Sequence, residues 1–292
     1  MYTSEEKWLV ALHFLLPAPY PFYKQLKKQC RSYDRIHELT ERDLLHYEPR
    51  RRKKYQQLIS KVDQRYVEQV FQELRQKEIV AIPYTSAYYP ELLRQVYDPP
   101  AVLYAKGQLQ YLKKRKLAIV GARKATNYTW RALQQLMHAS FDVGIVSGLA
   151  AGADRMAHEC AISIGLPTIA ILGHGFDYCY PKSNEALAQY MMAHELVLSE
   201  YPPSYSPKRW MFPMRNRIIS GLSEAIIVSE ARIKSGTMST VDYGLNHGRT
   251  IFAIPGPIDS VLSEGPHKLI DEGATPLYAA RQIMSFLREN EE

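Results

Sequence analysis

From about Leu117 onward the sequence alternates short apolar runs with helical segments, and this alternation constrains the fold more than any other feature. The runs are LAIVG, GIVSG, TIAILG, ELVLSE, AIIVSEA and TIFAIPG, and we expect helices at 129–141, 153–164, 184–193, 216–222, 237–247 and 276–289. Short apolar strands that alternate with helices form a parallel sheet with both faces covered. We therefore predict an α/β fold with a doubly wound, mostly parallel sheet.

The N-terminal quarter has a different pattern, typical of several short amphipathic helices. SEEKWLVALHFL offers Ser4 as an N-cap, followed by acidic residues in the first turn. In DQRYVEQVFQELRQK the residues that share one helix face are Tyr66, Val67, Val70, Phe71 and Leu74. We expect a small all-α domain at 1–75, an extended, proline-punctuated linker at 76–110 and the α/β domain at 111–292.

The chain is basic, with 37 Lys and Arg against 30 Asp and Glu and a net charge of +7. Up to Lys106 there are 18 basic and 13 acidic residues, so most of the excess lies in the N-terminal part. A basic protein favours polyanionic partners. The run PRRRKKY at 49–55 is either a solvated helix face or an accessory phosphate-binding patch.

Several classes of protein are disfavoured. Cys30, Cys160 and Cys179 are odd in number and lack CxxC spacing, which argues for free, mostly buried thiols rather than disulfides or a zinc site. The longest apolar runs are much shorter than the ~20 residues that span a bilayer. The N-terminus is acidic before its apolar run, unlike a secretory signal, so we expect a cytoplasmic protein that does not contact a membrane.

Ligands of an open parallel sheet bind beyond the carboxyl ends of the strands, so the residues that follow each strand are informative. Glycines, hydroxyl groups and cations follow the expected strands, as in GARK at 121–124, SGLAAGAD at 147–154, YPKSN at 180–184 and SGT at 235–237. Glycine lets backbone N–H groups approach an anion, and the helix N-termini that follow add partial positive charge. The pattern predicts an anion-binding edge.

Neither common nucleotide motif is present at this edge. GARKATN lacks the second glycine of GxGxxG, and GxxxxGK[ST] does not occur in the chain. A longer phosphate polymer fits better, and single-stranded nucleic acid is the natural candidate because a positive groove can follow its backbone. The aromatic residues that flank FPMRNRIISGLS either pack in the core or stack on bases; they are Tyr201, Tyr205, Trp210 and Phe212.

Asp154 and His158 lie four residues apart on an expected helix, a spacing that is compatible with metal ligation. A third ligand is not in view, so helix capping by Asp154 and core packing of His158 are favoured over a metal site. We expect neither a metal nor another cofactor.

Together these motifs resemble the DprA/Smf family, the DNA-processing proteins of natural transformation. The resemblance rests on LAIVGAR, GIVSGLAAGADRMAHECAI, YPKSN, LSEYPP, FPMRNRIISGLS, EARIKSGTMST, FAIPG and GPHKLIDEGA, and covers about residues 82–275. It implies an extended Rossmann-like domain that binds single-stranded DNA, forms a homodimer and helps to load the recombinase RecA. It also implies that the protein is not an enzyme, and that its N-terminal helices are similar to a sterile-alpha-motif-type domain. The family's C-terminal winged helix is not expected.

The resemblance assigns Arg123 and Lys182 to the DNA backbone. It assigns seven more residues to the same pocket, namely Gly148, Gly152, Arg215, Asn216, Arg217, Ser235 and Gly236. We expect Arg215 and Arg217 to reach a phosphate or brace its pocket, because the arginine fork donates two bonds to phosphate.

Other positions are assigned less directly. The family's dimer interface is expected around Leu245 and Ile270. Ala153, Ser220 and His267 depart from the family pattern, in which isoleucine, alanine and asparagine are expected.

Two other functions remain open. The lysine-decarboxylase-like nucleotide phosphoribohydrolases share a Rossmann-like fold and carry a PGGxGT loop with a downstream glutamate. SGTMSTVDY has Ser235, Gly236, Thr237 and Asp242, but neither the tandem glycine nor the glutamate. A scaffold that only dimerises and recruits proteins would have no affinity for DNA.

Overall fold

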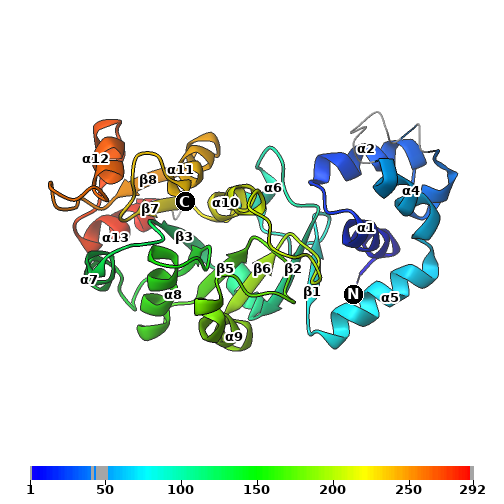
Figure 1. Cartoon of the computed structure of the whole chain (residues 1–292), viewed down its shortest axis with the longest axis horizontal. Helices are drawn as coiled ribbons and strands as arrows, with labels where there is room; N and C mark the ends of the chain where they lie inside the picture. Colours follow the sequence, from blue (N-terminus) through cyan, green and yellow to red (C-terminus); the bar gives the residue numbers. More distant parts are fainter. Residues whose placement is uncertain (1, 41–42, 44–51, 290–292) are drawn as a thin grey trace. The chain divides into compact units, whose positions relative to one another are not determined.

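The computed structural model describes residues 2–40, 43 and 52–289, apart from the side chains of 52–54 (Figure 1). The chain divides into two compact units. The first comprises Met1–Lys106, His174–Asp177 and Ser199–Ser206, and the second comprises Gly107–Gly173, Tyr178–Leu198 and Pro207–Glu292. The basic run expected at 49–55 lies, except for Tyr55, outside the described side chains. The domain limits near residues 75 and 110 remain predictions.

The first unit is mainly helical. Its elements are α1 (Ser4–Leu15), α2 (Tyr20–Cys30), the 3-10 helix η1 (Tyr33–Glu38), α4 (Arg52–Lys61), α5 (Gln64–Gln76), β1 (Val80–Pro83), α6 (Glu91–Arg94) and β2 (Val102–Gly107). The cap of α1 is Thr3 rather than the expected Ser4, because Thr3 Oγ1 accepts from Glu6 N and Thr3 N donates to Glu6 Oε2.

Helix α1 is the centre of this unit. The residues from Trp8 to His13 are buried all round the helix, as expected of a helix that is surrounded by protein. Helix α5 contributes Val67, Val70 and Leu74 to the same core, which confirms the apolar face expected there. Strands β1 and β2 pair antiparallel within the segment expected to be extended.

The second unit is the α/β domain. It contains η3 (Leu109–Lys113), β3 (Arg115–Val120), α7 (Asn127–Leu136), β4 (Val143–Ser147), α8 (Ala153–Ser163), β5 (Thr168–Leu172), η4 (Lys182–Asn184), α9 (Glu185–His194), β6 (Leu196–Ser199), α10 (Met211–Leu222), β7 (Ala225–Val228), α11 (Gly236–Asn246), β8 (Thr250–Ala253), α12 (Glu264–Asp271), β9 (Thr275–Pro276) and α13 (Ala280–Glu289).

The strands of this unit follow the order β6-β5-β4-β3-β7-β8-β9. Strand β3 pairs parallel with both β4 and β7, with Leu117 opposite Ile145 on one side and Ala225 on the other. The chain thus builds the sheet outward from β3 to β6 and then returns to the other side of β3. The expected doubly wound, mostly parallel sheet is confirmed, and its strand order reverses at β3, where such sheets bind ligands.

Helices cover both faces of the sheet. Leu117, Ile119 and Ile227 face a core formed with α7, α8 and α13. On the opposite face α10 and α11 pack together, and a Cβ on Gly244 of α11 would lie 2.3 Å from Ile226 Cδ1. Neighbouring residues of β7 therefore point to opposite helical layers, as the strand period requires.

Some helix limits differ from those expected. Helix α10 begins at Met211 rather than near residue 216, because Pro213 falls in the first turn, where its missing N–H costs little. Helix α13 begins at Ala280 because Thr275–Pro276 pairs with β8. Helix α12 was not expected, since Gly265 and Pro266 in its first turn resemble loop residues.

The three cysteines are free, and Cys30 and Cys160 are buried, as the sequence predicts. Within the described ranges, no helix combines the length and apolar character that a membrane crossing requires.

Candidate nucleic-acid interface

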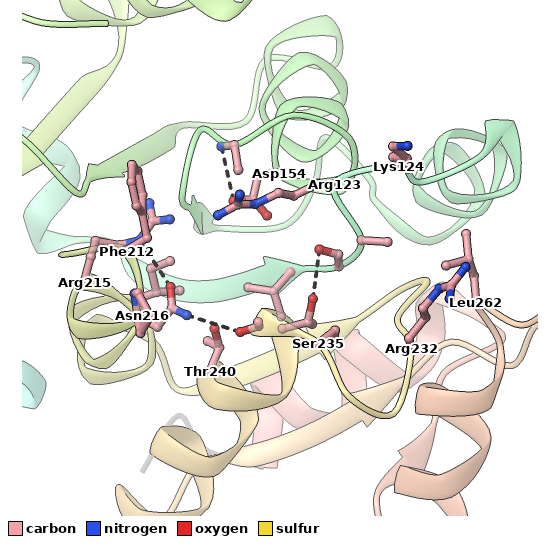
Figure 2. A pocket seen from close by; sticks show the side chains of 18 residues that line it. Arg123, Lys124, Asp154, Phe212, Arg215, Asn216, Arg232, Ser235, Thr240 and Leu262 are labelled. Atoms are coloured by element: carbon pink, nitrogen blue, oxygen red, sulfur yellow. Dashed lines mark hydrogen bonds between the residues drawn. The ribbon is translucent and has the colours of Figure 1, made fainter. Parts of the chain in front are cut away.

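A cavity of about 590 Å³ opens at the carboxyl end of β3 (Figure 2). The segments that follow β3, β4 and β7 line it, together with residues 212–219 of α10, the start of α11 and Leu262. Its polar and charged lining residues are Arg123, Lys124, Asp154, Arg215, Asn216, Arg232, Ser235, Thr237 and Thr240. Three of the strand-end segments expected at this edge, 121–124, 147–154 and 235–237, therefore contribute to one cavity, whereas 180–184 does not.

The loop after β3 presents two cations to the cavity. Arg123 and Lys124 are exposed, and no ion pair is found for either within the described part of the chain. A buried carboxylate, Glu230, holds the loop: it accepts from Thr126 N (2.6 Å), Thr126 Oγ1 (2.8 Å) and Thr129 Oγ1 (2.9 Å). This clamp joins residues 104 and 101 positions apart, so local sequence patterns do not indicate it.

Gly148 and Gly152 allow close packing of protein on protein. A Cβ on Gly148 would lie 2.4 Å from the Arg215 guanidinium nitrogens. Gly152 has a φ of +76°, and its Cβ would lie 2.3 Å from Ala122 O. The glycines after β4 thus bring the loops of the cavity together, whereas we expected them to admit an anion.

Arg215 is buried, with 4% of its surface exposed, and its guanidinium donates to the carbonyls of Gly148 and Ile171. It therefore joins the ends of β4 and β5. Of the two roles expected for Arg215, these contacts are those of a brace.

Asp154 lies beside this arginine and accepts from Ala150 N (3.3 Å). Burial raises the pKa of Asp154 above its ordinary value, and the charge of Arg215 opposes the rise. Arginine and aspartate thus hold the loop between β4 and α8.

Arg217 does not line the cavity. It is 1% exposed, and its Nη1 donates to Met214 O at 3.3 Å within α10. Asn216 does line the cavity, and its Nδ2 donates to Ser239 Oγ (2.8 Å) and Gly236 O (3.4 Å). Asn216 therefore ties α10 to the first turn of α11.

The start of α11 offers unused hydrogen-bonding capacity. Ser235 is the N-cap residue, but its Oγ is buried and has no hydrogen-bond partner among the described residues. A Cβ on Gly236 would meet nothing within 4 Å, so the backbone there is open. An accessible helix N-terminus with free N–H groups attracts anions.

A smaller hollow of about 120 Å³ shares Arg123, Phe212 and Arg215 with the cavity and is also lined by Tyr180 and Pro181. Lys182 follows Pro181 at the start of η4; it is exposed and lines neither hollow.

Asn184, two residues after Lys182, was not singled out from the sequence. Its Nδ2 donates to Leu149 O and Ala150 O, both at 3.0 Å, so YPKSN also supports the loop after β4.

Phe212 is the aromatic residue that the structure places in the cavity. Its ring lies 5.2 Å from that of Tyr180, and the Arg123 guanidinium carbon lies 5.8 Å from its centre. Trp210 is exposed at the N-cap of α10. Tyr201 and Tyr205 belong to the first unit, where their rings stack 6.1 Å apart.

The proposed dimer residues lie away from the cavity lining. Leu245 is 61% exposed near the end of α11, and Ile270 is half-buried on α12.

The departures from the family pattern are accommodated. Ser220 Oγ lies 2.9 Å from His247 Nδ1, and His267 Nε2 lies 3.1 Å from Gly256 O. Ala153 is buried, and a Cβ on Gly121 would lie 2.6 Å from its Cβ.

His158 is buried in the core, with Nδ1 2.7 Å from Thr168 Oγ1. Burial, together with the charge of Arg215, lowers the pKa of His158 to about 3. Asp154 and His158 thus have separate partners. Among the residues that the structure describes, no three His, Cys, Asp or Glu side chains gather as a metal site would need.

Comparison with known proteins agrees with the motifs. Residues 80–288 match the family model described as DNA recombination-mediator protein A. The DNA processing protein DprA of Bacillus subtilis is 44% identical over 74% of this chain and 73% of its own length. The crystal structure of DprA from Streptococcus pneumoniae superposes with a TM-score of 0.83 and 32% identity over 98% of both chains.

A structure of DprA from Helicobacter pylori, described as giving insight into how that protein binds single-stranded DNA, covers 74% of this chain and 98% of its own chain. Its TM-score is 0.66 and its identity 28%. The resemblance found in the sequence is therefore confirmed: the chain belongs to the DNA recombination-mediator protein A family.

Proposed function

We propose that the protein binds single-stranded DNA in the cavity at the end of β3 and processes incoming DNA in natural transformation. One observation carries the proposal: exposed cations and an open helix N-terminus converge on a cavity whose lining contains a single, buried carboxylate. A chain of phosphates satisfies such a lining better than a neutral or cationic ligand.

The resemblance assigns Arg123 and Lys182 to the DNA backbone; Arg123 lines the cavity, and Lys182 follows Pro181, which lines the smaller hollow. Both are exposed, and neither forms an ion pair within the described part of the chain, so their charges are available to a ligand. Each contact with a phosphate releases counterions from the strand, which makes binding depend on salt.

Phe212 and Tyr180 provide an apolar surface beside these cations. The two rings lie close together, and Phe212 lines both hollows. A base stacked on this surface would leave its phosphates near Arg123, and stacking tolerates every base because each has a π-face.

We propose a binding protein rather than an enzyme. The carboxylate of the lining, Asp154, is buried and engaged with the backbone of its own loop, so it is poorly placed as a general base. The phosphoribohydrolase alternative predicts that nucleoside monophosphates release free base when they are incubated with the protein, and we expect no such release.

The remaining family properties are also proposals for this chain. The resemblance supports loading of RecA, a cytoplasmic location and a homodimer, with Leu245 as an exposed apolar residue in a position to meet a second copy. We expect one DNA site in each protomer of such a dimer.

Titration of labelled oligo(dT) at increasing salt tests the proposal. Single strands show a slope of log K against log salt of about −0.7 per neutralised phosphate. We expect Arg123→Ala and Lys182→Ala each to weaken binding and to reduce the slope by about 0.7. Absence of binding, or slopes that neither substitution changes, would contradict the proposal.

A further inference from the structure

Figure 2 shows that Arg232 and Leu262 lie at the opposite end of the cavity from Phe212, Arg215 and Asn216. Arg232 is exposed and lines the cavity, and no ion pair is found for it within the described ranges. Lys124, also exposed, lines the cavity from the loop after β3. This end of the cavity thus carries two exposed cations, Lys124 and Arg232, to which the proposed DNA contacts at Arg123 and Phe212 assign no role.

The backbone that carries Arg232 is held firmly. The preceding residue, Ala231, is fully buried; its N donates to Leu262 O (2.7 Å) and its O accepts from Gly265 N (2.9 Å). A Cβ on Gly265 would lie 2.5 Å from Ala231 O, so α12 approaches this loop closely. Arg232 therefore projects from a fixed point, which lowers the entropic cost of binding a ligand there.

The start of α11 lies between the two ends. Ser235 Oγ, buried and without a hydrogen-bond partner in the described structure, and the open backbone at Gly236 both line the cavity. Arg123, the helix N-terminus and Arg232 thus follow one another along the lining (Figure 2).

The size of the cavity also exceeds what one phosphate needs. A volume of about 590 Å³ lies within the range of about 300–1,000 Å³ in which pockets enclose a whole small-molecule ligand. A strand that enters at Arg123 and continues along the lining brings later phosphates to the end formed by Lys124 and Arg232.

We propose that Lys124 and Arg232 form a second backbone subsite, which holds phosphates farther along a strand already bound at Arg123. The inference rests on the proposed function, because it extends the same binding site. It makes the contribution of Arg232 dependent on the length of the strand, whereas that of Arg123 is present at every length that binds.

Fluorescence anisotropy with oligo(dT) of about 4 to about 16 nucleotides, the range of site sizes of single-strand modules, tests the length dependence on the full chain. With the longer strands, Arg232→Ala and Lys124→Ala should weaken binding and reduce the salt slope by about 0.7 each. With the shortest strand that binds, both variants should match the unmodified protein. Arg232→Lys should keep the slope, since the charge remains.

Arg281→Ala is the matched control, because Arg281 is an exposed arginine of α13 that lines neither hollow. It removes the same charge and should leave the slope unchanged at every length. Thermal unfolding midpoints of all these variants should match that of the unmodified protein, since the substituted side chains are exposed.

Two results would overturn the second subsite while the proposed function stands. In the first, Arg232→Ala leaves the slope unchanged at every length although Arg123→Ala reduces it. In the second, Arg232→Ala weakens the shortest strand as much as the longest, which would place Arg232 and Arg123 in one subsite. If Arg123→Ala and Lys182→Ala also have no effect, the proposed function fails as well.

Discussion

Replacement of Arg215 by methionine separates a brace from a DNA contact. The guanidinium is buried, donates to the carbonyls of Gly148 and Ile171, and lies beside the buried carboxylate of Asp154. Methionine fills a similar volume but provides neither hydrogen bonds nor charge. If Arg215 is a brace, the substitution costs stability before it costs phosphate binding.

The size of the loss follows from these contacts. Hydrogen bonds to a charged group contribute about 1.5–3 kcal/mol each. Loss of the guanidinium also leaves Asp154 buried without the positive charge that favours its ionised form, and an uncompensated buried charge costs up to about 3–5 kcal/mol. The same guanidinium serves both functions, so the two costs overlap, and we expect a loss of about 3–5 kcal/mol from a total stability of about 5–15 kcal/mol.

The loss should depend on pH. Burial already raises the native pKa of Asp154, and removal of the opposing positive charge of Arg215 raises it further. Between the ordinary pKa of aspartate and the raised one, the native state holds a proton that the unfolded state has released, so stability falls as pH rises through this window. Arg215→Met should therefore lose least stability in acid and most at neutral pH.

Urea unfolding at about pH 5 and about pH 8 measures this dependence, and oligo(dT) titration of the folded variant measures its salt slope. We expect a destabilised protein with weaker DNA binding and an unchanged slope. Adding Asp154→Asn should recover part of the stability, since the unpaired carboxylate is removed. Arg232→Met, at an exposed position, is the control and should be stable. A stable Arg215→Met protein whose slope falls by about 0.7 would refute the brace and make Arg215 a phosphate ligand.

Four further predictions concern other parts of the domain. Phe212→Ala should weaken DNA binding by about 1–3 kcal/mol with an unchanged salt slope, and Phe212→Trp should restore it, if a base stacks there. Asn216→Ala should lower the free energy of unfolding by about 1 kcal/mol in urea titration and weaken DNA binding, because it frees the first turn of α11. His158 has a native pKa of about 3, below its ordinary value of 6.5. Between these values only the unfolded state binds the proton, so the free energy of unfolding falls as pH drops. His158→Leu should reduce this fall when the free energy of unfolding is measured at several pH values. Leu245→Asp should shift a dimer toward monomer in sedimentation without changing DNA binding per protomer.

The sequence alone determined the α/β domain and the edge that carries the site. The spacing of apolar residues in strands and helices is a local property that the sequence shows directly. Because ligands bind beyond the carboxyl ends of parallel strands, the predicted strands also indicate where a ligand binds. The resemblance to the DprA/Smf family assigns Arg123, Asn216, Ser235 and Gly236, among others, to one pocket. All four line it.

Only the tertiary structure decided which cations face the cavity. Arg215 and Arg217 stand two residues apart in the sequence, yet both are buried and only Arg215 reaches the lining. The carbonyls that receive Arg215 lie 67 and 44 residues away, on loops whose separation depends on how β4 and β5 pair. Arg232 was not predicted as a binding residue, because the residues next to it in the sequence do not indicate that it lines the cavity. The sequence shows which residue types follow each strand. The burial and the hydrogen-bond partners of those residues depend on contacts between segments far apart in the sequence, and local sequence patterns do not show such contacts.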